Sequence, residues 1–166
     1  MRQKGRDAKN PSVPDYKTQV TESYVMDPAG GYPAGFKSHY KNLIFTNAQQ
    51  LLNLHIKGRF IEQLQEFSQL SADELADIIG ISRSKYYRLI KEAQLGIESI
   101  DSLSTFLKLW NKGVIAFDGN DANFREWLHS NNHSLGGIRP IELLKTETGR
   151  REIERAIDRI EYSVYG

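Results

Sequence analysis

The chain has 166 residues, 39% of them hydrophobic and 26% charged, which is enough to bury the core of one or two small domains. Its formal net charge of +1 excludes a polycation, so any nucleic-acid binding must come from a local basic patch. The lack of cysteine excludes a disulfide framework, a thiolate zinc site and a cysteine nucleophile, and it agrees with a reducing cytosol.

No apolar run approaches the roughly 20 residues that a membrane span requires. The basic N-terminus is not followed by the apolar core of a signal peptide. We therefore expect a soluble, cytoplasmic protein.

Residues 1–42 are predicted to form an extended or disordered arm, because four of the five prolines lie there and apolar residues show no sustained period. The first stretch of the arm is basic, so it is either a solvated tail or a source of phosphate contacts to DNA. Its basic residues are Arg2, Lys4, Arg6 and Lys9. An aromatic cluster could instead pack the arm against the body of the protein. Its members are Tyr24, Tyr32, Phe36 and Tyr40.

Helical spacing of apolar residues dominates from Asn47 onward. A short apolar segment is interrupted at Gly58, and a helix is predicted from about residue 59 to residue 69. No segment alternates as a half-buried strand would. The predicted fold class is therefore all-α.

Residues 70–92, LSADELADIIGISRSKYYRLIKE, predict a helix-turn-helix. Ser71 and Glu74 have the spacing of a capping box, which starts a helix by pairing two otherwise unsatisfied amides. This helix is predicted to end at Gly80, because glycine adopts a left-handed conformation without a steric penalty. Four residues before it, Ala76 supplies the small side chain that two closely crossing helices require.

The second helix of this unit is predicted over about residues 83–93, with Ser82 as its N-cap. Tyr86 and Leu89 would face the first helix. The opposite face is strongly basic and suits the major groove of DNA. The candidate DNA-binding residues are Arg83, Ser84, Lys85, Tyr87, Arg88 and Lys91.

Within this basic face, Arg83 and Lys85 near the helix start are the better candidates for base contacts. Arg88 and Lys91 are the better candidates for phosphate contacts. The alternative is a plain helical hairpin with a solvated basic face. Because one helix-turn-helix reads one half-site, a homodimer is expected.

The next helix is predicted to carry apolar residues from Ile100 to Trp110 and to end at Gly113. A turn at residues 117–119 follows, and Asp121 is expected to cap a helix that contains Phe124, Trp127 and Leu128. After a loop, Pro140 would begin a short helix, since proline is favoured at the first helical position.

Thr146 is predicted to cap the last helix. Its apolar stripe is Ile153, Ala156, Ile157, Ile160 and Val164. Acidic and basic residues nearly cancel on the other face, where Glu147 and Arg151 form a favourable i, i+4 pair. Such a face suits solvent or a protein partner better than nucleic acid.

Residues from about 109 to 166 resemble the toxin-binding domain of the Xre/MbcA/ParS antitoxin family. The resemblance rests on Phe117 through Gly119 and on the segment REWLHSNNHSLGGIRPIELLKTETGRREIERAIDRIEYSVYG. This segment contains the WL pair, the LGG loop, the proline followed by LL, the T-x-x-G helix start and the RIEY tail of the family. Ser163 stands where the family often has glycine, and FDGND replaces a shorter FGD turn.

The resemblance covers roughly residues 45–166, because the helix-turn-helix resembles the Xre-like half of the same family. After the arm, which has no match in the family, it implies a DNA-binding domain at residues 43–108 and a toxin-binding domain at residues 109–166. It also implies a type II antitoxin without enzymatic activity or cofactor. Its usual partner is a RES-domain toxin that attacks NAD, whereas related members face toxins that use NAD to modify proteins. The C-terminal domain covers the entrance to the toxin's active site, and the helix-turn-helix represses the shared operon.

The aromatic C-terminal tail is the candidate toxin contact, since aromatic residues and arginine are favoured in interface hot spots. The alternative is that Tyr162 and Tyr165 pack on their own domain. Gly136 and Gly137 are expected to set a tight loop, next to the candidate Arg139. The candidate toxin-binding residues are Arg139, Arg159, Glu161, Tyr162, Tyr165 and Gly166.

His129 and His133 have the spacing of helical zinc ligands, but the helix is predicted to end between them and no carboxylate or cysteine completes a site. We therefore expect no metal. The main alternative function is a stand-alone helix-turn-helix transcription regulator whose C-terminal domain dimerises or senses a ligand. A small enzyme is a more distant alternative.

Overall fold

The computed structural model of the protein describes residues 34–92 and 94–165, with side chains placed over residues 37–92 and 94–162. In this described part the regular structure is helical, with one isolated bridge between Asn132 and Ile138, and the predicted all-α class is confirmed. The arm predicted before residue 34, including its basic residues, lies outside the described residues.

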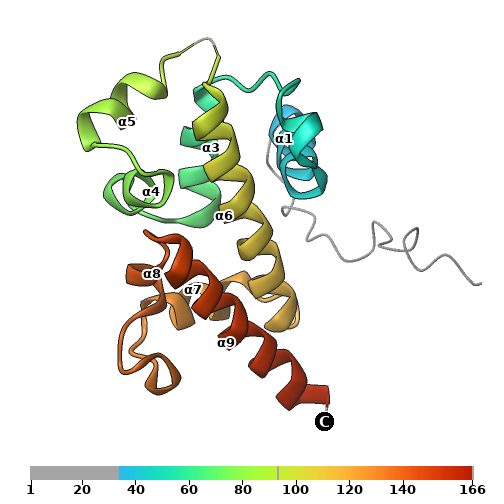
Figure 1. Ribbon diagram of the computed structural model, residues 1–166, viewed down its shortest axis with the longest axis vertical. Coiled ribbons are helices and arrows are strands. Elements are labelled where there is room, and N and C mark those ends of the chain that lie inside the picture. The colour runs from blue at the N-terminus through green and yellow to red at the C-terminus, as the bar shows by residue number, and fades with distance from the viewer. Residues whose placement is uncertain (1–33, 93, 166) are drawn as a thin grey trace, which may run out of the picture.

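The helices follow one another along the chain as Figure 1 shows. They are α1 (Ala34–Phe45), α2 (Ala48–Leu51), α3 (Arg59–Ser68), α4 (Ala72–Ile79), α5 (Arg83–Leu89), α6 (Ile97–Ala116), α7 (Asp121–His129), the short 3-10 helix η2 (His133–Leu135), α8 (Pro140–Leu143) and α9 (Glu147–Tyr165).

The α1 helix corrects the prediction of an extended arm, which is wrong from residue 34 onward. Tyr40 and Leu43 lie three residues apart on one face of α1 and are fully buried. The Tyr40 ring meets Phe67 edge-on, as an aromatic residue that packs the arm against the body would do. The Ser104 hydroxyl of α6 donates to the Leu43 carbonyl at 2.7 Å. Composition did not predict this helix, because prolines and glycines are frequent just before residue 36.

The predicted capping and turn signals of the helix-turn-helix are confirmed. The Ser71 hydroxyl accepts the Glu74 amide, and the Glu74 carboxylate accepts the Ser71 amide at 2.8 Å. Gly80 ends α4 with a φ of 77°, and the Ser82 hydroxyl accepts the Lys85 amide. Only the length of α5 differs from the prediction of about residues 83–93. The helix ends at Leu89, and turns follow it.

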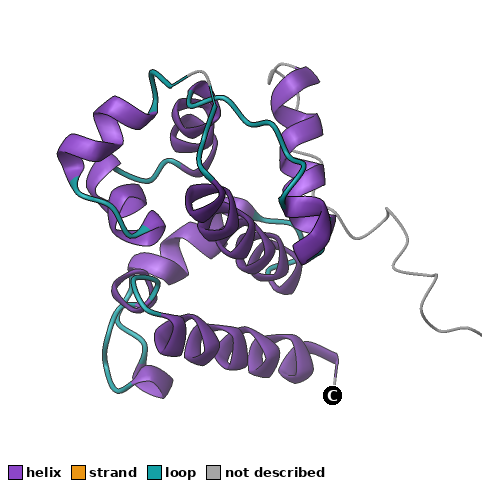
Figure 2. Ribbon diagram, turned by 45° about the horizontal axis from the view of Figure 1, so that its top comes forward, coloured by secondary structure: helices purple, strands orange, loops and turns teal. Residues whose placement is uncertain are grey.

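The long helix α6 is the spine of the molecule, with α1 on one side and α4 and α5 on the other (Figure 1). It packs against α1, α4 and α9, so residues from both predicted domains share one hydrophobic core. Figure 2 shows α9 running past α6 beneath the helix-turn-helix. The predicted domain boundary between residues 108 and 109 falls inside this helix.

Gly113 does not end α6, which corrects the predicted boundary. The helix continues to Ala116, and a Cβ at position 113 would overlap the Phe124 ring of α7. Glycine is present there because two helices approach closely, rather than because the chain turns. The turn comes at Asp118 and Gly119, both with positive φ, as predicted for residues 117–119.

Two further helix starts follow from local capping. The cap of α7 is Asn120 rather than the predicted Asp121, because the Asn120 side chain accepts the Asn123 amide at 3.1 Å. Pro140 occupies the first turn of α8, and the Thr146 hydroxyl accepts the Gly149 amide at 3.0 Å, as predicted. In α9, Ile153, Ala156 and Ile157 are buried, which confirms that part of the predicted stripe.

Substituting Gly113 tests the close approach of α6 and α7. We expect Gly113→Ala to lower the free energy of unfolding by about 1–3 kcal/mol, because the new methyl group must displace a fully buried ring. Urea denaturation followed by circular dichroism measures the effect. Gly96→Ser is the matched control, since nothing lies within 4 Å of a Cβ there and serine is a good N-cap. Equal stability of Gly113→Ala and the wild type would contradict the packing argument.

Candidate DNA-binding and toxin-binding surfaces

The second helix of the helix-turn-helix presents its predicted face to solvent. Tyr86 and Leu89 are buried, and the Tyr86 hydroxyl donates to the Gln65 amide oxygen of α3 at 2.6 Å. Burial raises the pKa of Tyr86 to about 12. All six candidate DNA-binding residues are exposed: Arg83, Ser84, Lys85, Tyr87, Arg88 and Lys91.

The basic residues of this face differ in how they are held. Arg83 pairs with Asp73 of α4 at 3.0 Å and lies 6.0 Å above the Tyr87 ring. A hydrogen bond with Tyr87 and the charge of Asp73 raise the pKa of the Arg83 guanidinium. Within the described residues Lys85, Arg88 and Lys91 form no ion pair. Arg83 is therefore held by its ion pair, whereas no described carboxylate pairs with the other three cations.

Two further cations lie beside α5 and were missed by the sequence analysis. The Gly58 amide donates to the Glu92 carbonyl at 3.0 Å, and a Cβ on Gly58 would overlap the Leu89 carbonyl. The exposed Lys57 and Arg59, which flank Gly58, therefore lie next to the C-terminal end of α5. No local signal indicates this, because the contact joins segments about 30 residues apart.

A row of polar contacts attaches α4 to the C-terminal helices. Glu74 pairs with His129 of α7 at 3.0 Å, and Asp77 pairs with Lys145 at 2.7 Å. One turn after Glu74, the Ile78 carbonyl accepts a hydrogen bond from the Arg150 guanidinium of α9 at 2.7 Å. Residues 74, 77 and 78 share one face of a helix, so this face is the seam between the two parts of the chain.

The charges of this row shift the pKa values of its members. Desolvation opposes ionisation of Glu74, but hydrogen bonds from Ser71 and His129 outweigh it and lower the pKa of the carboxyl. Asp77 raises the pKa of Lys145. The His129 ring contacts Glu74 and the Arg125 carbonyl, and no group of three potential metal ligands occurs among the described side chains.

The loop of residues 130–139 and α9 together form the candidate toxin-binding surface. Gly136 and Gly137 both have positive φ, so they set a tight loop as predicted. The Arg159 guanidinium donates to the Ser134 hydroxyl at 3.4 Å and thereby joins α9 to this loop. Arg139 is half-exposed and pairs with Glu142 at 2.6 Å.

The end of α9 carries the most exposed aromatic residue of the described part. Tyr162 is 79% exposed, so the alternative that it packs on its own domain is wrong. Glu161 is half-buried, whereas the side chain of Tyr165 and all of Gly166 lie outside the described residues. Ile138, 43% exposed in the loop, is a second apolar contact candidate that periodicity could not find.

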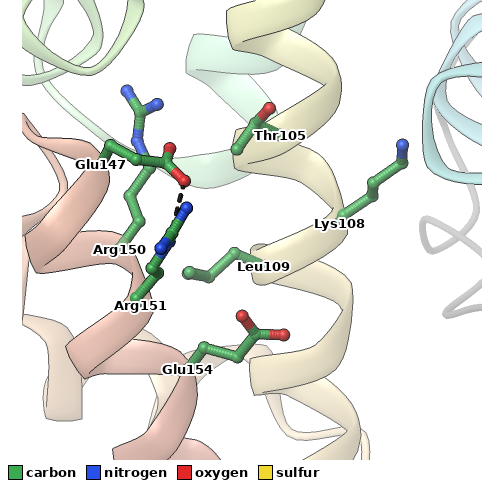
Figure 3. A pocket seen from close by; sticks show the side chains of 7 residues that line it. All are labelled: Thr105, Lys108, Leu109, Glu147, Arg150, Arg151 and Glu154. Atoms are coloured by element: carbon green, nitrogen blue, oxygen red, sulfur yellow. Dashed lines mark hydrogen bonds and ion pairs between the residues drawn. The ribbon is translucent and has the colours of Figure 1, made fainter. Parts of the chain in front are cut away.

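A groove of about 230 Å³ separates α6 from α9 (Figure 3). Leu109 lies at its base, while Glu147 and Arg151 pair at 3.1 Å on one wall. Glu154 adds a carboxylate on the α9 side, whereas the Lys108 side chain points away from α9, and its ammonium donates to the Thr46 carbonyl at 2.9 Å.

The described part is thus helical, with a basic exposed side on α5 and an exposed aromatic residue near the end of α9. None of the described helices has the length and apolar character that a membrane crossing needs.

Comparison with known proteins shows what the chain is similar to. Residues 112–162 match the antitoxin Xre/MbcA/ParS C-terminal toxin-binding domain. The chain is 22% identical to an Antitoxin Xre of Photorhabdus laumondii over 115 residues, covering 69% of this chain and 78% of the relative. It is 26% identical to an Antitoxin Xre of Yersinia enterocolitica over 106 residues, covering 63% and 72%. The predicted resemblance to Xre/MbcA/ParS-type antitoxins is thus confirmed, and it supports a type II antitoxin whose partner is a toxin.

Arg150 is the central residue of the seam. Its guanidinium donates to the Leu144 carbonyl at 2.9 Å and to the Ile78 carbonyl at 2.7 Å, so it satisfies the C-terminal ends of two helices. We expect Arg150→Ala to lower the free energy of unfolding by about 1–3 kcal/mol, because both carbonyls lose their partner.

Arg151→Ala is the matched control for this substitution. Its ion pair with Glu147 is exposed, so its loss should change the free energy of unfolding by less than about 1 kcal/mol. Chemical denaturation of both variants gives the comparison. Equal effects of the two substitutions would show that Arg150 does not hold the seam.

Proposed function

We propose that this chain neutralises a RES-domain toxin that degrades NAD, by covering the entrance to the toxin's active site. The exposure of Tyr162 carries this proposal, because it lies at the end of the segment that matches a toxin-binding domain. Burial of a large, exposed aromatic side chain by a partner lowers the free energy of the complex. Ile138 and Arg139 provide further contacts from the loop, and Arg159 provides one from α9.

We further propose that the helix-turn-helix represses the operon of the antitoxin and its toxin. Support comes from the exposed face of α5, where Lys85, Arg88 and Lys91 are available for base edges and phosphates. Lys57 and Arg59 extend this basic surface beyond the helix. Since the whole chain is nearly neutral, the local patch supplies the attraction.

Toxin neutralisation is tested by co-expression of this chain and a RES-type toxin from separate inducible promoters, which removes any effect of autoregulation. The wild type should restore growth and cellular NAD. Tyr162→Ala should weaken toxin binding roughly 30-fold or more, as expected for an interface anchor. Deletion of residues 161–166 should abolish neutralisation.

Tyr87→Ala, at an exposed tyrosine of α5, is the control and should neutralise the toxin fully. If the wild type fails to relieve toxicity, the antitoxin proposal fails, and the alternative of a stand-alone regulator gains support. If the folded truncated chain neutralises fully, the tail has no part in binding.

Operator binding is tested with the DNA upstream of the operon. Arg88→Ala and Lys91→Ala should each weaken binding and reduce the slope of log K against log salt concentration by about 1, because each removes a phosphate contact. Fluorescence anisotropy across a salt series measures both quantities. Arg139→Ala removes an exposed arginine far along the chain and should leave the slope unchanged. Unchanged binding of the double variant would exclude α5 from the interface.

A further inference from the structure

Arg83, the first residue of α5, is held from two sides. Its Nη1 atom donates to a carboxylate oxygen of Asp73 in α4 at 3.0 Å. Four residues further along α5, the centroid of the Tyr87 ring lies 6.0 Å from the central carbon of the Arg83 guanidinium. The two contacts come from neighbouring helices at one edge of the molecule (Figure 1). Together they restrict a side chain that otherwise samples many rotamers.

Tyr87 is itself supported by the core. The buried Tyr86 ring meets the Tyr87 ring edge-on, with 5.5 Å between the ring centroids. The Tyr86 hydroxyl donates to the Gln65 amide oxygen of α3 at 2.6 Å, which fixes the orientation of the buried ring. Support from the core thus reaches the exposed Arg83 through Tyr87.

Asp73 places a negative charge beside the surface that we propose for DNA. Phosphate groups repel a carboxylate, so this charge on its own would weaken DNA binding. Its side chain is 59% exposed, and an ion pair at such a position adds little to stability. One structural role is a favourable carboxylate in the first turn of α4. The ion pair with Arg83 gives the same carboxylate a role in orienting a DNA-binding residue.

The ion pair leaves one edge of the Arg83 guanidinium for a base. Asp73 binds Nη1, whereas Nε and Nη2 form an edge with two parallel N–H groups that the carboxylate does not occupy. Two parallel donors match the O6 and N7 acceptors of guanine in the major groove. The Arg83 side chain is 65% exposed, so a base can approach this edge.

We infer that Asp73 is a positioning residue for operator recognition, which orients Arg83 against Tyr87 to contact one guanine of the half-site. The inference rests on the proposed operator binding and adds to it the base and the residue that sets the preference for that base. A side chain that is ordered before binding loses less conformational entropy on contact. Discrimination should therefore depend on Asp73, although Asp73 itself contacts no base.

Operator duplexes that carry 7-deazaguanine in place of single guanines test the inference, because this base lacks the N7 acceptor. The operator is first mapped by footprinting, and each guanine of the half-site is then replaced in turn. For the wild type, one replacement should weaken binding about 5-fold or more, the loss expected for a bidentate arginine contact. Arg83→Ala should bind the normal and the replaced duplex equally at that position. Fluorescence anisotropy measures each affinity.

Asp73→Ala should reduce the loss at the same guanine by about 2-fold or more, because Arg83 must then be ordered on binding. Removal of the negative charge should at the same time strengthen binding to non-specific DNA. The matched control is Glu147→Ala, since Glu147 also lies in a first helical turn and forms an exposed pair with an arginine, Arg151 of α9. It should leave both quantities unchanged.

Circular dichroism establishes that each variant is folded before its affinity is compared. A wild type that binds the operator but is insensitive at every guanine would overturn the inference and leave the proposed repression intact. The inference also fails if Asp73→Ala retains the full sensitivity of the wild type, because Asp73 then only stabilises the start of α4. If the wild type does not bind the operator, the proposed repression fails and the inference fails with it.

Discussion

The packing around Trp110 holds the two parts of the chain together. Its side chain is fully buried in α6, with Phe67 of α3 at 6.1 Å and Phe124 of α7 at 5.3 Å between ring centroids. Aromatic rings bury large apolar areas and prefer such tilted or edge-on contacts. Because Phe124 also lies against Gly113, the helix that begins the C-terminal part cannot shift without disturbing the core of the helix-turn-helix.

Around this shared core, the described charges are distributed by surface. The exposed side of α5 is basic, whereas the seam along α4 joins opposite charges. Tyr162 near the end of α9 and Ile138 in the loop of residues 130–139 are instead exposed apolar side chains. The basic side of α5 and the exposed apolar residues suit different partners, since phosphate groups and an apolar protein pocket favour different side chains.

The seam gives the proposed functions a physical connection. Glu74 and Asp77 lie in the first helix of the helix-turn-helix, and their partners His129 and Lys145 lie in the part that matches a toxin-binding domain. Arg150 joins the same two parts through backbone carbonyls. The predicted division at residue 108 falls inside α6, which is continuous across it.

Sequence alone determined the features that depend on near neighbours. The capping box of α4, the glycine turn at Gly80, the buried face of α5 and its exposed basic side all follow from spacing within a few residues. Family resemblance located the toxin-binding segment. Tertiary structure decided the rest. Only packing shows that Gly113 lies inside a helix against Phe124, that α1 is helical and that Tyr162 is left in water. The physical reason is that burial and close approach join residues far apart in the chain, which periodicity and composition do not encode.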